Sequence, residues 1–147
     1  MRLEDFLESV QEARLEERRM SERIEELESR ARKITPAYAQ NAGGGGESGG
    51  PQSLWALLAD ERSQLELRHR RAREREIAVE RFIQLIPGPN QRMVLRLRYL
   101  DGKRLEDAAG VMHYSYDWTR RTSAGAMKAA RKLWRERYGD FAPKEDV

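Results

Sequence analysis

Apolar residues recur at helical intervals along most of the 147-residue chain. In the first segment they follow a heptad pattern, with steps of three and four residues between them. Two positions of the heptad form the apolar seam, in which Glu17 is the one polar member: Leu3, Val10, Glu17, Ile24 and Ala31, then Phe6, Ala13, Met20, Leu27 and Ile34. The pattern predicts an amphipathic helix over residues 1–35, because Pro36 disfavours helix in the residue before it.

A second long helix is predicted after a stretch rich in glycine and proline. Residues 36–53 have almost nothing to bury and predict a flexible tether. Residues 54–86 carry apolar residues at both ends and a charged middle, and Trp55 and Phe82 are expected to seal helix contacts. Such a helix gains little from folding alone, so it is expected to pair with the first helix, either within one chain or between chains.

The segment Pro87-Gly88-Pro89 ends this helix and predicts a domain boundary. Residues 89–138 then predict a small helical domain, and residues 139–147 a tail. The domain is predicted to begin with a short helix over residues 90–100, which a turn at Asp101-Gly102 ends.

The middle of this domain has the spacing of a helix-turn-helix. Residues 105–112 predict a two-turn helix, the next three residues a tight connection, and residues 116–137 a longer helix. This is the arrangement that places one helix in the major groove of DNA. Ser115 can cap the second helix, and the small side chains of Ala108 and Ala109 allow the two helices to cross closely.

Composition excludes several kinds of chemistry. Without cysteine there is no disulfide, thiol nucleophile or zinc-thiolate site, and the two histidines are far apart in the sequence. The carboxylates lie in helix charge patterns from which no acid–base pair stands out. No apolar run approaches the roughly 20 residues that span a bilayer. We therefore expect a cytoplasmic protein that is not an enzyme, needs no cofactor and does not enter a membrane.

Charge is distributed unevenly along the chain. Residues 1–50 hold 8 basic and 11 acidic residues, a net charge of −3, whereas residues 88–139 hold 12 basic and 5 acidic residues, a net charge of +7. A concentrated positive region attracts polyanions, and on DNA it gains affinity by releasing condensed counterions. The basic C-terminal region therefore points to double-stranded DNA as the partner.

Three motifs in this region carry a resemblance: MVLRLRY, RLEDAAGVMHYSYDWTRR and AMKAARKLW. They resemble region 4 of sigma-70-type factors, which recognises the promoter −35 element. The whole chain resembles the phage-encoded, ArpU-like late-transcription regulators. The resemblance implies an all-α fold with two long, coiled-coil-like N-terminal helices, a Gly-rich tether and a C-terminal helix-turn-helix domain. It also implies a sequence-specific transcriptional regulator of phage or prophage origin that works with host RNA polymerase at the bacterial nucleoid.

By position, the resemblance implies the DNA-binding residues. The front of the recognition helix, with its cap, comprises Ser115, Tyr116, Asp117, Trp118, Arg120 and Arg121. Asp117 stands where sigma factors have an acidic base-reading residue, and Arg120 where they have a basic one. An aspartate can accept a hydrogen bond from cytosine N4, and an arginine can donate twice to guanine. Further along the helix, phosphate contacts are expected from Lys128, Arg131, Lys132 and Arg135.

The chain also departs from the sigma pattern. Thr119 and Thr122 stand where sigma factors have apolar residues, and Tyr116 and Trp118 replace basic ones, so the base preference of the family does not transfer. Trp118 could equally stack on DNA or cover an apolar neighbour, whereas Trp134 is expected to pack in the core. Nothing before residue 88 resembles region 2, so the chain is not expected to act alone as a sigma factor.

Two other functions fit the same sequence. A DNA-packaging accessory of the small-terminase type, or a recombination accessory, also joins a helix-turn-helix to oligomerising helices. Alternatively, the chain is a coiled-coil protein whose basic C-terminal domain binds another protein. The long helices are in either case expected to mediate self-association or partner binding.

Overall fold

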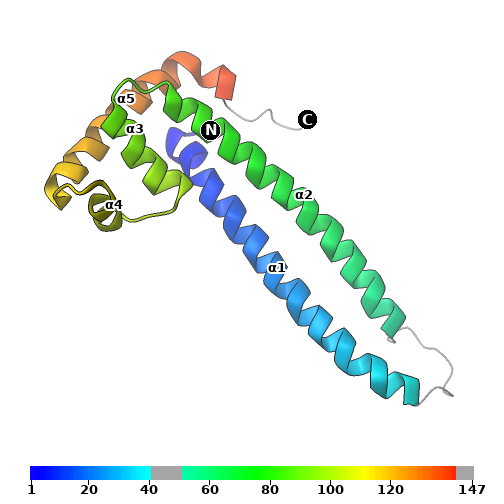
Figure 1. Cartoon of the computed structure of the whole chain (residues 1–147). Helices are drawn as coiled ribbons and strands as arrows, with labels where there is room; N and C mark the ends of the chain where they lie inside the picture. The colour runs from blue at the N-terminus through cyan, green and yellow to red at the C-terminus, as the bar shows by residue number, and fades with distance from the viewer. Residues whose placement is uncertain (41–50, 142–147) are drawn as a thin grey trace. The chain divides into compact units, whose positions relative to one another are not determined.

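The computed structural model describes residues 1–40 and 51–141, which are helical apart from short turns (Figure 1). The helices are α1 (Leu3–Gln40), α2 (Pro51–Gln84), α3 (Pro89–Leu95), the π-helix η1 (Arg96–Leu100), α4 (Leu105–Met112) and α5 (Tyr116–Phe141). Within these two ranges there is no strand, so the predicted all-α class is confirmed. Most of the predicted tether (41–50) and of the predicted tail (142–147) lies outside the described residues.

Both long helices extend further into the predicted tether than the sequence suggests. α1 continues through Pro36 to Gln40, so its predicted end at residue 35 is wrong. Proline removes one backbone hydrogen bond, but alanine, the best helix former, occurs twice among the next four residues and favours continuation. α2 begins at Pro51. Proline lacks a backbone N–H, but an N–H in the first helical turn has no acceptor within the helix, so no hydrogen bond is lost there.

The chain forms two compact units, which are described separately. The hairpin unit is Arg14–Ala72, and the composite unit joins Met1–Ala13 to Arg73–Val147. α1 and α2 each contribute to both units. The second unit is called composite because its two pieces come from distant parts of the sequence.

In the hairpin unit the two long helices pair within one chain. Its core contains Ile24, Leu27 and Ala31 of α1 and the fully buried Leu58 of α2. The buried residues of α1 belong to the heptad seam, which therefore faces α2. The sequence left open whether the helices pair within or between chains, and in this unit the pairing is intramolecular.

Charged pairs accompany this seam. The Arg62 guanidinium donates to the Glu28 carboxylate at 2.6 Å, and this hydrogen bond is the main reason that the pKa of Glu28 is lowered. Glu17, the polar member of the heptad seam, lies 2.5 Å from Nδ1 of His69. At this position of the heptad seam, α1 and α2 are therefore in polar contact instead of apolar contact.

The composite unit is built around a core that crosses the predicted domain boundary. Its buried side chains come from four segments: Leu3, Phe6, Leu7 and Val10 of α1; Val79, Phe82 and Ile83 of α2 with Ile86 just after it; Leu95 and Leu100; and Ala126, Met127, Ala130 and Trp134 of α5. Phe6 stacks on Trp134 with ring centroids 4.8 Å apart. Contrary to the predicted boundary at residues 87–89, the helix-turn-helix shares one core with both long helices, because their terminal apolar residues need its surface for burial.

The two aromatic residues that were expected to seal helix contacts, Trp55 and Phe82, differ in burial, and Trp134 packs in the core as expected. Phe82 and Trp134 are buried and meet edge to face, with centroids 5.8 Å apart. Trp55 is 41% exposed, so the prediction is wrong for this residue. Leu54 and Leu58 occupy the side of α2 that faces α1, and Trp55 lies about 100° further round the helix than Leu54.

α1 is also joined to the composite unit by hydrogen bonds. The Gln11 amide donates to the carbonyl oxygens of Tyr99 at 3.2 Å and Leu100 at 2.9 Å. These carbonyls lie at the C-terminal end of η1, where a helix leaves acceptors without partners of its own. Gly102 follows with φ 68, a left-handed conformation that glycine adopts without strain and that turns the chain towards α4.

The first helix of the predicted domain is not α-helical to its end. The sequence predicts a continuous helix over residues 90–100, but the last five residues form the π-helix η1. The N–H of Asp101 donates to the carbonyl of Arg96, five residues earlier, at 3.0 Å. This wider turn still buries Leu97 and Leu100, and α3 and α4 both pack against α5 (Figure 1).

Candidate nucleic-acid interface

The predicted helix-turn-helix corresponds to α4, a tight turn and the start of α5. Ala108 and Ala109 are buried where α4 contacts α5, as their small size predicts. α4 ends at Met112, and the C-cap residue His113 is left-handed at φ 60 and ψ 35. The N–H of Tyr114 donates back to the carbonyl of Ala109 at 3.1 Å. The chain therefore reverses within three residues and enters α5 at Tyr116.

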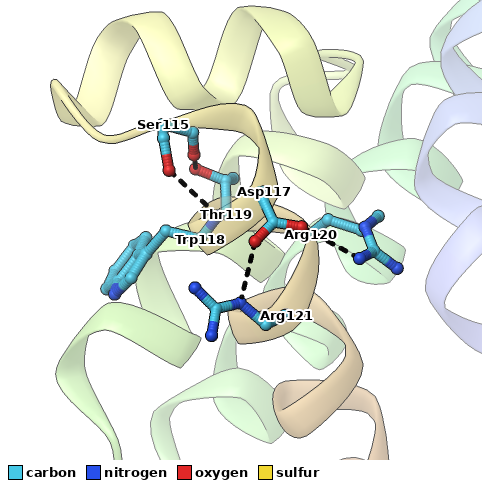
Figure 2. Close-up of polar contacts among 6 residues, drawn as sticks. All are labelled: Ser115, Asp117, Trp118, Thr119, Arg120 and Arg121. Atoms are coloured by element: carbon cyan, nitrogen blue, oxygen red, sulfur yellow. Dashed lines mark hydrogen bonds and ion pairs between the residues drawn. The ribbon is translucent and has the colours of Figure 1, made fainter.

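Ser115 caps α5 as the sequence predicts. Its Oγ accepts a hydrogen bond from the N–H of Trp118 at 3.1 Å (Figure 2). Its carbonyl accepts a second bond, at 2.9 Å, from the hydroxyl of Thr119, a residue that is completely buried. The hydroxyl is thereby satisfied inside the helix, which explains how a threonine occupies a fully buried position.

Replacing Ser115 by alanine is expected to lower the free energy of unfolding of the composite unit by about 1 kcal/mol, because one N–H at the helix start loses its acceptor. Urea unfolding measures the change. Ser63→Ala is the control, since the Ser63 hydroxyl bonds to the carbonyl of Ala59 within a helix and caps nothing. Equal effects of the two substitutions would contradict the capping role.

The predicted basic residues of α5 share one face of the helix. At about 100° per residue, the side chains of Asp117 and of the basic residues fall within an arc of about 120°. We call the basic members the basic stripe: Arg120, Arg121, Lys128, Arg131, Lys132 and Arg135. All are exposed, and the stripe runs beside the buried face that contains Thr119 and Trp134. The structure thus gathers the predicted charged site residues on a single surface.

At the front of the stripe, one carboxylate binds two arginines. The Asp117 carboxylate accepts a hydrogen bond from Nη2 of Arg120 at 3.0 Å and lies 3.2 Å from Nε of Arg121 (Figure 2). The hydrogen bond from Arg120, followed by the charge of Arg121, lowers the pKa of Asp117. Asp117 is therefore ionised at neutral pH, and both arginines are paired in the free protein. The spacing of three and four residues is the sequence signal for these pairs.

The rear of the stripe is different. Lys128, Lys132 and Arg135 form no ion pair with any residue in the described part of the chain. Arg131 has a weaker contact, with Nε 3.9 Å from the Glu4 carboxylate. Most of the rear charge is consequently available to an external anion.

The two aromatic residues predicted at the front do not lie on the stripe. The ring of Trp118 is stacked on that of Tyr114, with centroids 3.8 Å apart and planes 20° apart. Of the two roles left open for Trp118, the free protein shows the one in which it covers a neighbouring ring. Tyr116 is 48% exposed. At about 100° per residue, Trp118 and Tyr116 point to opposite sides of the direction of Asp117.

Three arginines counted in the basic region serve the fold instead. Arg92 donates to the carbonyls of Ile86 at 2.7 Å and Pro87 at 2.9 Å. Arg96 pairs with Glu80 at 2.9 Å. Arg98 donates to the hydroxyl of the buried Ser123 at 2.8 Å. Sequence reasoning did not identify these structural roles, for which the only signal is the position of each arginine beside the apolar residues of a short helix.

The described residues offer no site for a metal, since they contain no group of three histidine, aspartate or glutamate side chains arranged to hold an ion. Over the same part of the chain, no helix has the length and apolar character needed to cross a membrane.

No family model matches the sequence, and no curated protein or solved structure matches it either. The resemblance to sigma region 4 therefore depends on the sequence motifs alone.

Proposed function

We propose that the protein is a double-stranded DNA-binding transcriptional regulator that inserts the front of α5 into the major groove. The observation that carries the proposal is the basic stripe on a helix that follows a short helix and a three-residue turn. The major groove is about 12 Å wide and admits one α-helix. A capped helix with its cations on one face presents that face to phosphates and base edges together.

The residues of α5 divide into two roles. Arg120 and Arg121 lie within the first two turns, where a recognition helix meets base edges, and an arginine can donate twice to guanine. Asp117 can accept a hydrogen bond from the exocyclic amine of cytosine. Lys128 and Lys132 lie further along the same face and contact phosphates, which adds affinity without sequence information.

The likeness to sigma region 4 supports a role in transcription of phage or prophage genes, with host RNA polymerase as the second partner. Because no segment before residue 88 resembles region 2, we propose that the chain acts together with polymerase and not as a complete sigma factor. The exposed outer faces of the hairpin unit are the surface proposed for association with polymerase or with a second copy.

The double substitution Arg120→Ala and Arg121→Ala is expected to weaken binding to a duplex that the wild-type protein selects from a random pool at least tenfold at low salt. Each lost phosphate contact also makes the slope of log affinity against log salt less steep by about 0.9, so a change of about 1–2 is expected. Fluorescence anisotropy across a salt series measures both quantities. The control is Arg70→Ala with Arg71→Ala, which removes the same charge from two exposed positions of the hairpin unit.

If the wild-type protein does not bind duplex DNA, the proposed function is wrong. If it binds but the Arg120 and Arg121 variant binds equally well, DNA contact through the front of α5 is wrong. Circular dichroism of each variant verifies that a change in affinity does not come from unfolding.

A further inference from the structure

We infer that Asp117 is a specificity-determining residue that holds Arg120 and Arg121 back from the phosphates of non-cognate DNA. The inference rests on the proposed function. It assigns to the carboxylate a role in the free protein that is separate from the reading of a base.

At the start of α5 a single carboxylate, that of Asp117, is paired with two arginines. One carboxylate lies within 3.0 Å of Arg120 and 3.2 Å of Arg121, the two cations closest to the tip of the recognition helix. The three side chains are 59–68% exposed, so they are accessible to DNA while they are paired with one another. The trio carries a net charge of +1 where the two arginines alone would carry +2.

On non-cognate DNA this pairing weakens the contact between the two arginines and the phosphates. Binding that ignores sequence comes from cations that neutralise phosphates and release counterions. Arg120 and Arg121 can reach a phosphate only by sharing or leaving the Asp117 carboxylate, and that carboxylate is itself repelled by the phosphate. The front of the helix therefore binds phosphate weakly at any sequence whose bases provide no hydrogen-bond donor for Asp117.

At a cognate site Asp117 gains a hydrogen-bond donor from the DNA. A base that presents an amine in the major groove, such as N4 of cytosine or N6 of adenine, can donate to Asp117. The carboxylate then keeps a partner when the arginines turn to guanine or phosphate. The protein discriminates between sequences because the unfavourable presence of the Asp117 carboxylate near the DNA is compensated at a cognate site and not at other sites.

The rear of the stripe supports this division. Lys128, Lys132 and Arg135 form no ion pair among the described residues and can contact phosphates at any sequence. At the front of the helix both arginines are paired with an acidic neighbour, whereas at the rear, among the described residues, Arg131 alone approaches one, with 3.9 Å to Glu4. The lowered pKa of Asp117 keeps this arrangement ionised at the pH of DNA-binding measurements.

The test is Asp117→Asn, which keeps the shape of the side chain and removes its charge. Affinity for a mixed-sequence duplex is expected to rise about three- to tenfold at low salt. The salt slope is expected to become steeper by about 1–2, because two more cations are available to phosphates. The preference for duplexes that the wild-type protein selects from a random pool is expected to shrink.

The matched control is Asp140→Asn. Asp140 also lies on α5 and pairs with an arginine three residues away, Arg137, at 3.0 Å, but this pair lies outside the basic stripe. Its substitution is expected to leave affinity and salt slope unchanged. Urea unfolding of both variants shows whether the start of α5 remains folded.

The outcomes separate the inference from the function on which it rests. Tighter binding by Asp117→Asn alone supports the inference. If the wild-type protein binds DNA and Asp117→Asn binds the mixed duplex with equal or lower affinity, the inference is wrong and the proposed function stands. If the wild-type protein does not bind duplex DNA, both are wrong.

Discussion

Replacing Phe6 by alanine is expected to lower the free energy of unfolding of the composite unit by about 3–5 kcal/mol, the usual cost of removing a fully buried aromatic ring. Phe6 is completely buried, stacks on Trp134 at 4.8 Å and meets Phe82 edge to face at 5.6 Å. Domains of this size are stable by only about 5–15 kcal/mol, so the loss is a large part of the total. Urea unfolding followed by tryptophan fluorescence measures it.

Leu15→Ala is the control for this prediction. Leu15 lies on the same helix but is 44% exposed, so its truncation is expected to cost less than about 1 kcal/mol. The Phe6 variant is also expected to bind DNA less well in proportion to its unfolded fraction, although Phe6 is not on the basic stripe. A Phe6 variant as stable as the Leu15 variant would contradict the shared core.

Replacing Leu58 by alanine is the second large effect, and it concerns the other unit. Leu58 is fully buried against Ile24, Leu27 and Ala31, so the substitution is expected to destabilise the hairpin unit by about 2–5 kcal/mol. Hydrogen exchange is expected to show faster exchange of backbone amides in residues 20–31 and 54–65. DNA affinity is expected to remain near that of the wild type, because the basic stripe belongs to the composite unit.

The neighbouring residue provides a matched control. Leu57 is 39% exposed, so Leu57→Ala removes the same atoms from the outer side of α2 and is expected to leave exchange almost unchanged. Equal effects at positions 57 and 58 would mean that the heptad seam does not stabilise the hairpin.

The local elements of the candidate site were predictable from the sequence because their signals are short-range. The predicted helix over residues 105–112 coincides with α4, and α5 begins at the predicted Tyr116. Ser115 caps it as expected, since a serine before a helix bonds to an N–H only three residues away. The shared face of the basic residues likewise follows from helical spacing alone.

Other features depend on which surfaces meet in space. Periodicity identified Phe6 as an apolar position of the seam, but it could not show that the ring packs on Trp134 instead of pairing with the second long helix alone. The π-helix η1 has no distinctive residue preference that would separate it from an α-helix. Arg98 is charged like its neighbours, and only the tertiary structure shows that it is bound to Ser123.

The amide bonds from Gln11 to Tyr99 and Leu100 have a consequence for the order of folding. They join groups 88 and 89 positions apart in the sequence. Contacts between such distant residues form late, because closing a long stretch of chain costs entropy before any contact compensates it. While the protein is being synthesised, the apolar start of α1 can meet the end of α2 first, but its core is complete only after η1 and α5 leave the ribosome. The hairpin unit ends at Ala72 in the sequence and can fold first. It then holds α1 and α2 together, which lowers the entropy cost of the later contacts.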